Sequence, residues 1–181
     1  MKIAVFCGSS RHCDPGFLDP ARALGAEIAQ RGHVLVYGGS RTGLMGAVAD
    51  AALDGDGRVE GVIAQRFVDS AVHHSGLDEL RVVVDMRERK AAMDARAEAF
   101  VALPGGYGTL EELSEILSFR KLGLHRRLLV LLDPDGYYAG LLAQIERAVA
   151  AGFEPEGSRD YFGVARDACS AVDLCEASIK G

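Results

Sequence analysis

The stretch with the clearest chemical potential is Pro104-Gly105-Gly106-Tyr107-Gly108-Thr109-Leu110-Glu111-Glu112, which follows an apolar run and leads into a helical pattern. Glycines let a backbone approach a ligand closely, and the free N–H groups of a helix N-terminus attract anions. A phosphate is therefore the expected ligand. Glu112 lies in the first turn of this helix, and Glu115 lies three residues on, on roughly the same face. Because a carboxylate repels phosphate, its presence here suits a reaction in which a cationic centre develops.

Glu112 also has a structural interpretation. The spacing Thr109-x-x-Glu112 matches a capping box, in which the Glu side chain reaches back to the N-cap amide. The pattern alone favours neither role. Asp85-Met86-Arg87-Glu88 has the same spacing, and there we expect Asp85 to be a plain N-cap.

A basic helix is predicted over residues 86–97, directly after a strand-like run that ends at Val84. Arginine suits bidentate binding of phosphate or carboxylate, which favours a functional role at the ligand edge. The alternative is a solvated basic face whose methionines pack in the core. The basic side chains of this helix are Arg87, Arg89, Lys90 and Arg96.

Two further glycine turns follow apolar runs, Cys7-Gly8-Ser9-Ser10 and Tyr37-Gly38-Gly39-Ser40-Arg41-Thr42-Gly43. Ligands of open α/β sheets bind at the carboxyl ends of the strands, so three such turns at one edge predict an anion site. The alternative is that the glycines only make tight strand-to-helix turns. None of the turns is a P-loop, and the second lacks the spacing of a dinucleotide fingerprint.

Short apolar runs alternate with longer amphipathic segments. The strands we predict are Lys2–Phe6, Val34–Tyr37, Val59–Ile63, Leu80–Val84, Ala99–Leu103 and Leu128–Leu132. The helices we predict cover about 19–31, 43–53, 86–97, 109–122, 138–151 and 168–179. Continuously apolar strands that alternate with helices favour a parallel sheet covered on both faces. We therefore predict a Rossmann-like, doubly wound α/β fold in one domain, residues 1–181.

Composition narrows the classes of function. The chain has 181 residues, 49% of them hydrophobic and 25% charged, which excludes a disordered protein. Its net charge of −6 disfavours nucleic acid as a partner. The longest apolar runs have the length of a strand, and the first is cut off at Gly8, too early for a secretory signal. We expect a cytoplasmic protein with no membrane or nucleic-acid partner.

We expect no metal and no cofactor. The four cysteines form two C-x5-C pairs, Cys7 with Cys13 and Cys169 with Cys175, which match no common zinc pattern. The histidines are scattered and give no ligand cluster. Cys7 follows a strand-like run, so we interpret it as a small buried hydrophobe.

The motifs, taken in order, resemble the Lonely Guy (LOG) family of cytokinin riboside 5′-monophosphate phosphoribohydrolases, long mislabelled as lysine decarboxylases. The resemblance runs from residue 2 to about residue 153. It implies hydrolysis of the N-glycosidic bond of a nucleoside 5′-monophosphate to a free base and ribose 5-phosphate. It also implies a homodimer or a larger assembly. The stretches that carry it are 85–93, 104–112, Cys7–Ser10, Tyr37–Gly39, Gly43–Gly46, Leu122–His125 and Asp135–Tyr138.

By this resemblance, Arg89 and Glu112 form the catalytic pair. Cleavage of a glycosidic bond passes through an oxocarbenium-like transition state, which Glu112 would stabilise unless it orients the attacking water. Arg89 would position the substrate and help to keep Glu112 ionised, and the turn at 106–109 would hold the 5′-phosphate. The expected substrate-binding residues are Gly8, Ser9, Met86, Lys90, Gly105, Gly106, Tyr107, Gly108, Thr109, Leu110, Glu111, Glu115 and Ser118.

The sequence departs from the family pattern in three places. Ala71 stands where members commonly have the Glu of a Glu-x-Ala-His pattern, Ser40 replaces a frequent Gly, and Phe119-Arg120-Lys121 replaces Trp-x-Gln. The catalytic pair is intact, so we expect activity, with the preferred base open between an N6-isoprenoid adenine and adenine. The alternatives are a broader AMP or purine nucleotide nucleosidase and a non-catalytic carrier of nucleotide or molybdenum cofactor with the same fold.

Overall fold

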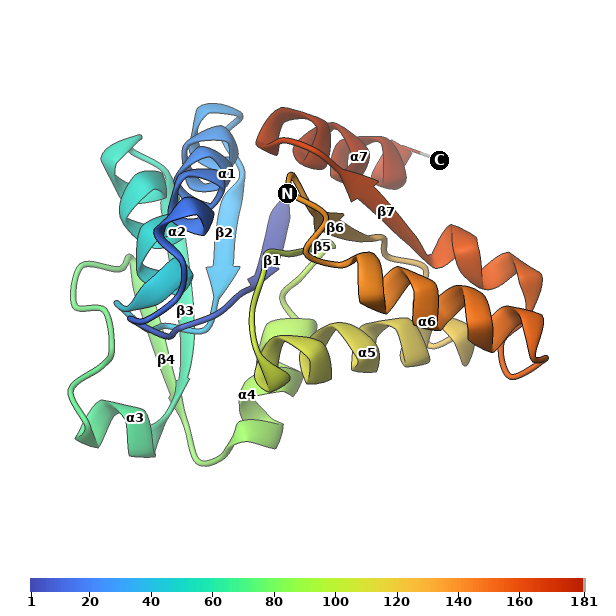
Figure 1. Ribbon diagram of the computed structural model, residues 1–181. Coiled ribbons are helices and arrows are strands. Elements are labelled where there is room, and N and C mark those ends of the chain that lie inside the picture. The colour runs from blue at the N-terminus through green and yellow to red at the C-terminus, as the bar shows by residue number, and fades with distance from the viewer. Residues whose placement is uncertain (181) are drawn as a thin grey trace.

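Seven parallel strands form one sheet in the computed structural model, which describes residues 1–180 and leaves Gly181, the last residue of the predicted domain, outside (Figure 1). The strands are β1 (Lys2–Phe6), β2 (Val34–Tyr37), β3 (Arg58–Ala64), β4 (Glu79–Val83), β5 (Ala99–Ala102), β6 (Leu129–Leu132) and β7 (Phe162–Ala165). The helices are α1 (Leu18–Gln30), α2 (Gly43–Asp54), α3 (Gln65–Asp69), α4 (Met86–Asp94), α5 (Tyr107–Lys121), α6 (Ala139–Ala150) and α7 (Ala168–Lys180). Two short 3-10 turns cover Pro15–Phe17 and Glu156–Tyr161.

The strand order is β4-β3-β2-β1-β5-β6-β7, and every neighbouring pair is parallel. The chain first builds outward from β1 to β4 and then returns to the other side of β1 with β5. Strands β1 and β5 therefore flank the switch point, where the loops that follow them diverge and leave a crevice. The prediction of a doubly wound Rossmann-like sheet is confirmed.

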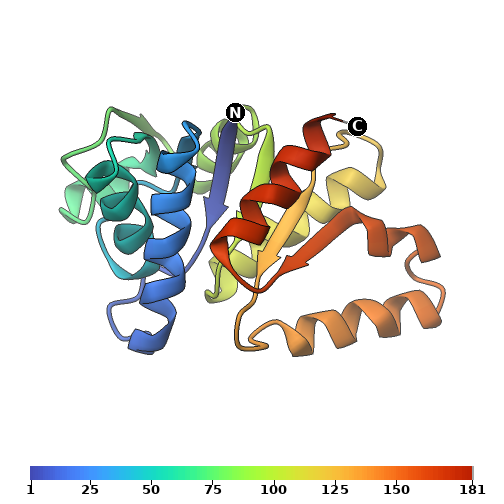
Figure 2. The ribbon, with the colours of Figure 1, turned by 90° about the horizontal axis from the view of Figure 1, so that it is seen from above.

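Both faces of the sheet are covered, which explains why its central strands are apolar throughout (Figure 2). Along β1, Ile3 and Val5 pack with α1, α2 and α7, whereas Ala4 and Phe6 pack with α4 and α5. Alternate side chains of a strand point to opposite faces, so a strand buried on both sides has no polar face. Among the described residues, no helix is long and apolar enough to cross a membrane.

Two elements were missed by the sequence patterns. Strand β7 is a four-residue edge strand with a glycine, and only Ala165 in it is buried. It therefore lacks the apolar run by which the inner strands were recognised. Helix α3 has five residues and no buried side chain, so it shows no amphipathic period. Helix α5 begins at Tyr107, two residues before the predicted start.

Candidate active site

The loops after β1 and β5 meet at the switch point. The N–H of Gly8 donates to the carbonyl of Pro104 at 3.0 Å, which joins the two loops directly. A Cβ on Gly105 would lie 2.0 Å from Thr109 Oγ1 and 2.9 Å from Gly8 N. Only glycine fits there, so the close approach of the two loops depends on residue 105 having no side chain.

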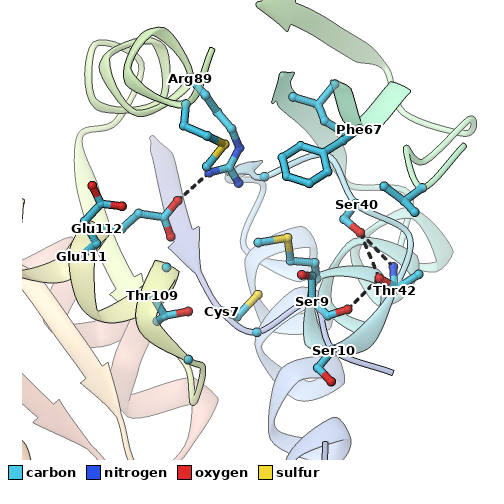
Figure 3. Close-up of a pocket in the computed structure, with 18 of the residues that line it drawn as sticks. Cys7, Ser9, Ser10, Ser40, Thr42, Phe67, Arg89, Thr109, Glu111 and Glu112 are labelled. Carbon is cyan, nitrogen blue, oxygen red and sulfur yellow. Dashed lines mark hydrogen bonds and ion pairs between the residues drawn. The ribbon is translucent and has the colours of Figure 1, made fainter. Parts of the chain in front are cut away.

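A cavity of about 590 Å³ opens beside this contact (Figure 3). Its first wall is polar and comes from the N-terminal turn of α5 with Glu112. Its opposite wall carries the hydroxyls of Ser9, Ser40 and Thr42, where Thr42 Oγ1 donates to the carbonyl of Ser9 at 2.7 Å. The apolar part of its lining consists of Met45, Ile63, Phe67, Val72 and Met86.

The three glycine turns are not equivalent as anion sites. At the start of α2, the N–H groups of Leu44 and Met45 donate to the carbonyl of Gly8 at 2.9 and 3.3 Å, so that helix end is already occupied. At the start of α5, the N–H groups of Tyr107, Gly108 and Thr109 have no acceptor in the described chain. The first N–H groups of a helix have no intrahelical partner, so this end is available to an anion.

Arg89 and Glu112 form a buried ion pair at the edge of the cavity (Figure 3). Arg89 Nη1 donates to Glu112 Oε1 at 2.6 Å, and the side chains are 5% and 6% exposed. Arg89 Nε also donates to the carbonyl of Val62 at 3.1 Å, which holds the guanidinium against β3. A Cβ on Gly38 would lie 1.9 Å from Arg89 Nη2, so the guanidinium fills the space that this glycine leaves.

Two opposing influences set the ionisation of Glu112. Burial raises the pKa of its carboxyl above the ordinary value, and the charge and hydrogen bond of Arg89 lower it. Burial is the larger effect, so the pKa of Glu112 lies above 4.5. Glu112 Oε2 accepts no hydrogen bond from the described residues, so this oxygen is free for a ligand or a water.

The capping-box interpretation of Glu112 is wrong. Helix α5 has Gly106 as its N-cap, not Thr109, and the Glu112 side chain binds Arg89 instead of a backbone amide. The second capping prediction is confirmed, because Asp85 Oδ1 accepts from the N–H groups of Arg87 and Glu88 at 2.9 Å.

Lys90 does not face the cavity. Its ammonium donates to Glu111 Oε1 at 2.8 Å and also to Glu115, which links α4 to α5. These hydrogen bonds, first that to Glu111, raise the pKa of Lys90. Lys90 therefore neutralises two of the three carboxylates near the start of α5, which reduces the electrostatic repulsion of an anion there.

The structure brings part of the predicted substrate-binding set into the cavity. Tyr107 is 93% exposed on the outside of α5, and Leu110 packs against the hydrophobic core. Ser118 lines a separate hollow of about 270 Å³ between α5 and α6. The predicted residues in the cavity lining are Gly8, Ser9, Met86, Gly106, Gly108, Thr109 and Glu111. Those outside it are Lys90, Gly105, Tyr107, Leu110, Glu115 and Ser118.

Two apolar residues of the cavity lining, Phe67 and Val72, were missed because they come from a segment without a clear sequence pattern. Phe67 lies on α3, and Val72 follows in the connection to β4. The carbonyl of Val72 accepts from Arg41 N at 2.9 Å, which ties this connection to the loop after β2. Ala71, where the family commonly has Glu, has a φ of 54° and directly precedes Val72.

Cys7 is buried, as expected, and its side chain also lines the cavity. Burial raises the pKa of the Cys7 thiol, which disfavours a thiolate nucleophile. No group of three or more His, Cys, Asp or Glu residues among residues 1–180 could hold a metal ion.

Comparison with known proteins gives one consistent set of relatives. A family model described as possible lysine decarboxylase matches residues 45–175. A probable cytokinin riboside 5′-monophosphate phosphoribohydrolase of Oryza sativa subsp. japonica is 47% identical, over 97% of this chain and 77% of the relative. A cytokinin riboside 5′-monophosphate phosphoribohydrolase of Arabidopsis thaliana is 46% identical over 84% and 70%, and one of Rhodococcoides fascians is 45% identical over 94% and 86%.

Similar solved structures share the fold at lower identity. The molybdenum cofactor binding protein of Rippkaea orientalis has a TM-score of 0.74 and 23% identity, over 98% of this chain and 96% of that one. The molybdenum cofactor carrier protein of Chlamydomonas reinhardtii has a TM-score of 0.73 and 18% identity, over 99% and 98%. At these identities the likeness concerns the fold alone.

Proposed function

We propose how the cavity works from one premise: the chain belongs to the Lonely Guy (LOG) family of cytokinin riboside 5′-monophosphate phosphoribohydrolases. The protein is an enzyme that hydrolyses the N-glycosidic bond of N6-substituted adenosine 5′-monophosphates, with a free base and ribose 5-phosphate as products. A pyridoxal phosphate decarboxylase would need a lysine for its Schiff base, and neither Lys2, Lys90 nor Lys121 lines the cavity.

The 5′-phosphate binds at the start of α5. Three N–H groups without an acceptor and the positive end of the helix dipole favour an anion there. A Cβ on Gly106 or Gly108 would meet no atom within 4 Å, so the approach to these amides is open. The base then lies across the cavity, toward the apolar side chains of Phe67 and Val72.

Glu112 and Arg89 carry the reaction. Glu112 lies one helical turn from the phosphate site, and its unbonded Oε2 stabilises the positive charge that develops on the ribose or orients the attacking water. Arg89 holds the other oxygen and keeps the carboxylate ionised inside a buried site. The observation that carries this proposal is the buried Arg89–Glu112 pair, which adjoins the only one of the three glycine turns with free helix amides.

Release of the free base, followed by chromatography, tests the proposal. The purified protein and Glu112→Gln are incubated with AMP, N6-isopentenyl-AMP and adenosine. We expect base release from the monophosphates and not from adenosine, with a loss of at least about a thousandfold in the variant. The ratio of the two monophosphate rates ranks the N6-substituted base against adenine. Base release by Glu112→Gln at the wild-type rate would refute the role of Glu112.

The assembly is a homodimer in this proposal, and residues 1–181 act as one domain. Leu122, Leu124 and Phe153 are exposed apolar side chains at the C-terminal ends of α5 and α6, where Lys121 Nζ donates to the Phe153 carbonyl. Burial of such a patch against a second copy stabilises a dimer. Light scattering after size exclusion gives the mass directly. The cytoplasmic location remains a prediction from the sequence.

A further inference from the structure

Each of the three backbone carbonyl groups just before the phosphate site accepts a hydrogen bond. Residues 103–105 form the turn between β5 and the start of α5. The carbonyl of Leu103 accepts from Tyr138 Oη at 2.6 Å, and the carbonyl of Gly105 accepts from Tyr137 Oη at 2.6 Å. The carbonyl of Pro104 accepts from Gly8 N at 3.0 Å. Three consecutive carbonyl oxygens are therefore fixed by three separate donors.

This arrangement determines which way the amides face. In a trans peptide the C=O and the N–H point in opposite directions, and the described chain has no cis peptide. Tyr137 draws the Gly105 carbonyl to itself, so the N–H of Gly106 points away from Tyr137. Gly106 lines the cavity and Gly105 does not. The same hydrogen bond thus keeps a negative carbonyl away from the free N–H groups at the start of α5, and it points the N–H of Gly106, the residue before them, to the cavity side.

The two tyrosines are themselves held in place. Tyr138 is buried, and its N–H donates to Asp133 Oδ1 at 3.3 Å at the end of β6. The Tyr137 ring packs edge-on against Tyr138 at 5.2 Å and against Phe17 at 5.5 Å, between ring centroids. Tyr137 is still 46% exposed, so its hydroxyl is not needed to fill the core.

From this geometry we infer that Tyr137, with Tyr138 behind it, is a positioning residue for the 5′-phosphate. It acts through the Gly105–Gly106 peptide and touches neither the ribose nor the base. The inference rests on the proposed phosphate site at the start of α5. It assigns to this tyrosine pair a part in binding the monophosphate that is separate from the chemistry of Glu112.

Tyr137→Phe tests the inference because it removes the hydroxyl and keeps the ring. We expect the KM for N6-isopentenyl-AMP to rise roughly fivefold, since one orienting hydrogen bond is lost, with kcat within about twofold. The acid limb of the pH profile stays where it is, because Glu112 is untouched. Tyr161→Phe is the matched control: its hydroxyl makes no hydrogen bond in the described chain, and its ring lies under Arg120. We expect wild-type KM in this control.

A binding measurement without turnover keeps the two proposals apart. Calorimetric titration with ribose 5-phosphate, the phosphate-bearing product, should give a Kd roughly fivefold weaker for Tyr137→Phe than for Tyr161→Phe. Unchanged affinity and unchanged KM in Tyr137→Phe would overturn the inference. A roughly fivefold loss of kcat without any change in KM would overturn it as well. If the wild type released no base at all, the proposed function would fail, and the titration would still decide whether Tyr137 positions a phosphate site.

Discussion

The pKa of Glu112 is set mainly by two opposing effects, burial of its carboxylate and the positive charge of Arg89. Catalysis needs the ionised form, so kcat/KM should fall as the pH drops through the raised pKa of Glu112, above 4.5. Arg89→Gln removes the charge that lowers this pKa. We expect the acid limb of that variant to move to higher pH by roughly one unit or more. Profiles of kcat/KM against pH for both proteins measure the shift.

An acid limb at the same pH in both proteins would show that Arg89 does not support the charge on Glu112. A lower rate across all pH values with no shift would instead assign Arg89 to substrate positioning alone. Circular dichroism of Arg89→Gln provides the control for folding, because the variant leaves Glu112 buried without its partner.

The Arg89–Glu112 pair also shows which features of single residues the sequence could not predict. The glycine turn and Glu112 were recognisable from type and spacing, but a Thr-x-x-Glu spacing also fits a cap. The hydrogen bond from the Arg89 guanidinium shows that Glu112 is not a cap. Arg89 lies 23 residues earlier in the chain, and only the folded structure brings it next to Glu112. Lys90, its neighbour, fits the same basic pattern and yet points to Glu111 and Glu115. One step along a helix turns a side chain by about 100°, so adjacent cations reach different partners.

At the scale of elements, the contact between α1 and α2 depends on one glycine. A Cβ on Gly25 would lie 2.1 Å from the carbonyl oxygen of Val48, a backbone atom that cannot turn aside. We expect Gly25→Ala to lower the free energy of unfolding by roughly 2–3 kcal/mol, because the helices must separate. The higher helix propensity of alanine offsets only about 1 kcal/mol. Urea denaturation measures the difference.

Gly140→Ala is the matched control for this prediction. Gly140 lies in α6, and a Cβ there would meet no atom within 4 Å. Its free energy of unfolding should stay the same or rise by up to about 1 kcal/mol. Equal stability of Gly25→Ala and Gly140→Ala would contradict the close packing of α1 on α2.

Elements with a clear hydrophobic pattern, either a continuous apolar run or a helical period, were predictable, and elements without one were not. The inner strands were recognised because burial on both faces demands apolar residues at every position. The edge strand β7 and the short α3 satisfy no such demand, since each leaves most of its side chains partly exposed. For the same reason the sequence did not predict Phe67 and Val72 as part of the cavity lining, since Phe67 lies on α3 and Val72 in the connection that follows it.

Over the whole molecule, several carboxylates are held by hydrogen bonds to basic side chains of other elements. Glu79 of β4 accepts from Arg96 at 2.9 Å, Glu146 of α6 binds Arg159, and Glu176 of α7 lies 2.9 Å from His33 Nε2. In each case the hydrogen bond is the first cause that holds the pKa of the carboxyl below its ordinary value. The pKa of Asp167 is lowered in the same way by the backbone N–H of Ser170, at the start of α7.

These lowered pKa values predict how the fold responds to acid. Between the ordinary carboxyl pKa and the lowered one, the unfolded chain binds more protons than the folded chain, so folding is favoured less as the pH falls. The stability that these four groups supply is therefore present above about pH 4.5 and is lost below it, whereas the raised pKa of Glu112 acts in the opposite direction for one group. We expect the Tm to fall steadily from pH 6 to pH 3 in scanning calorimetry. Because these pairs are exposed or only partly buried, 1 M salt should weaken this slope. Salt should not remove the slope, since Asp167 binds a backbone amide that salt screens less. A Tm that stays level or rises toward pH 3 would mean that the buried Glu112, and not the surface network, dominates the proton balance of the fold.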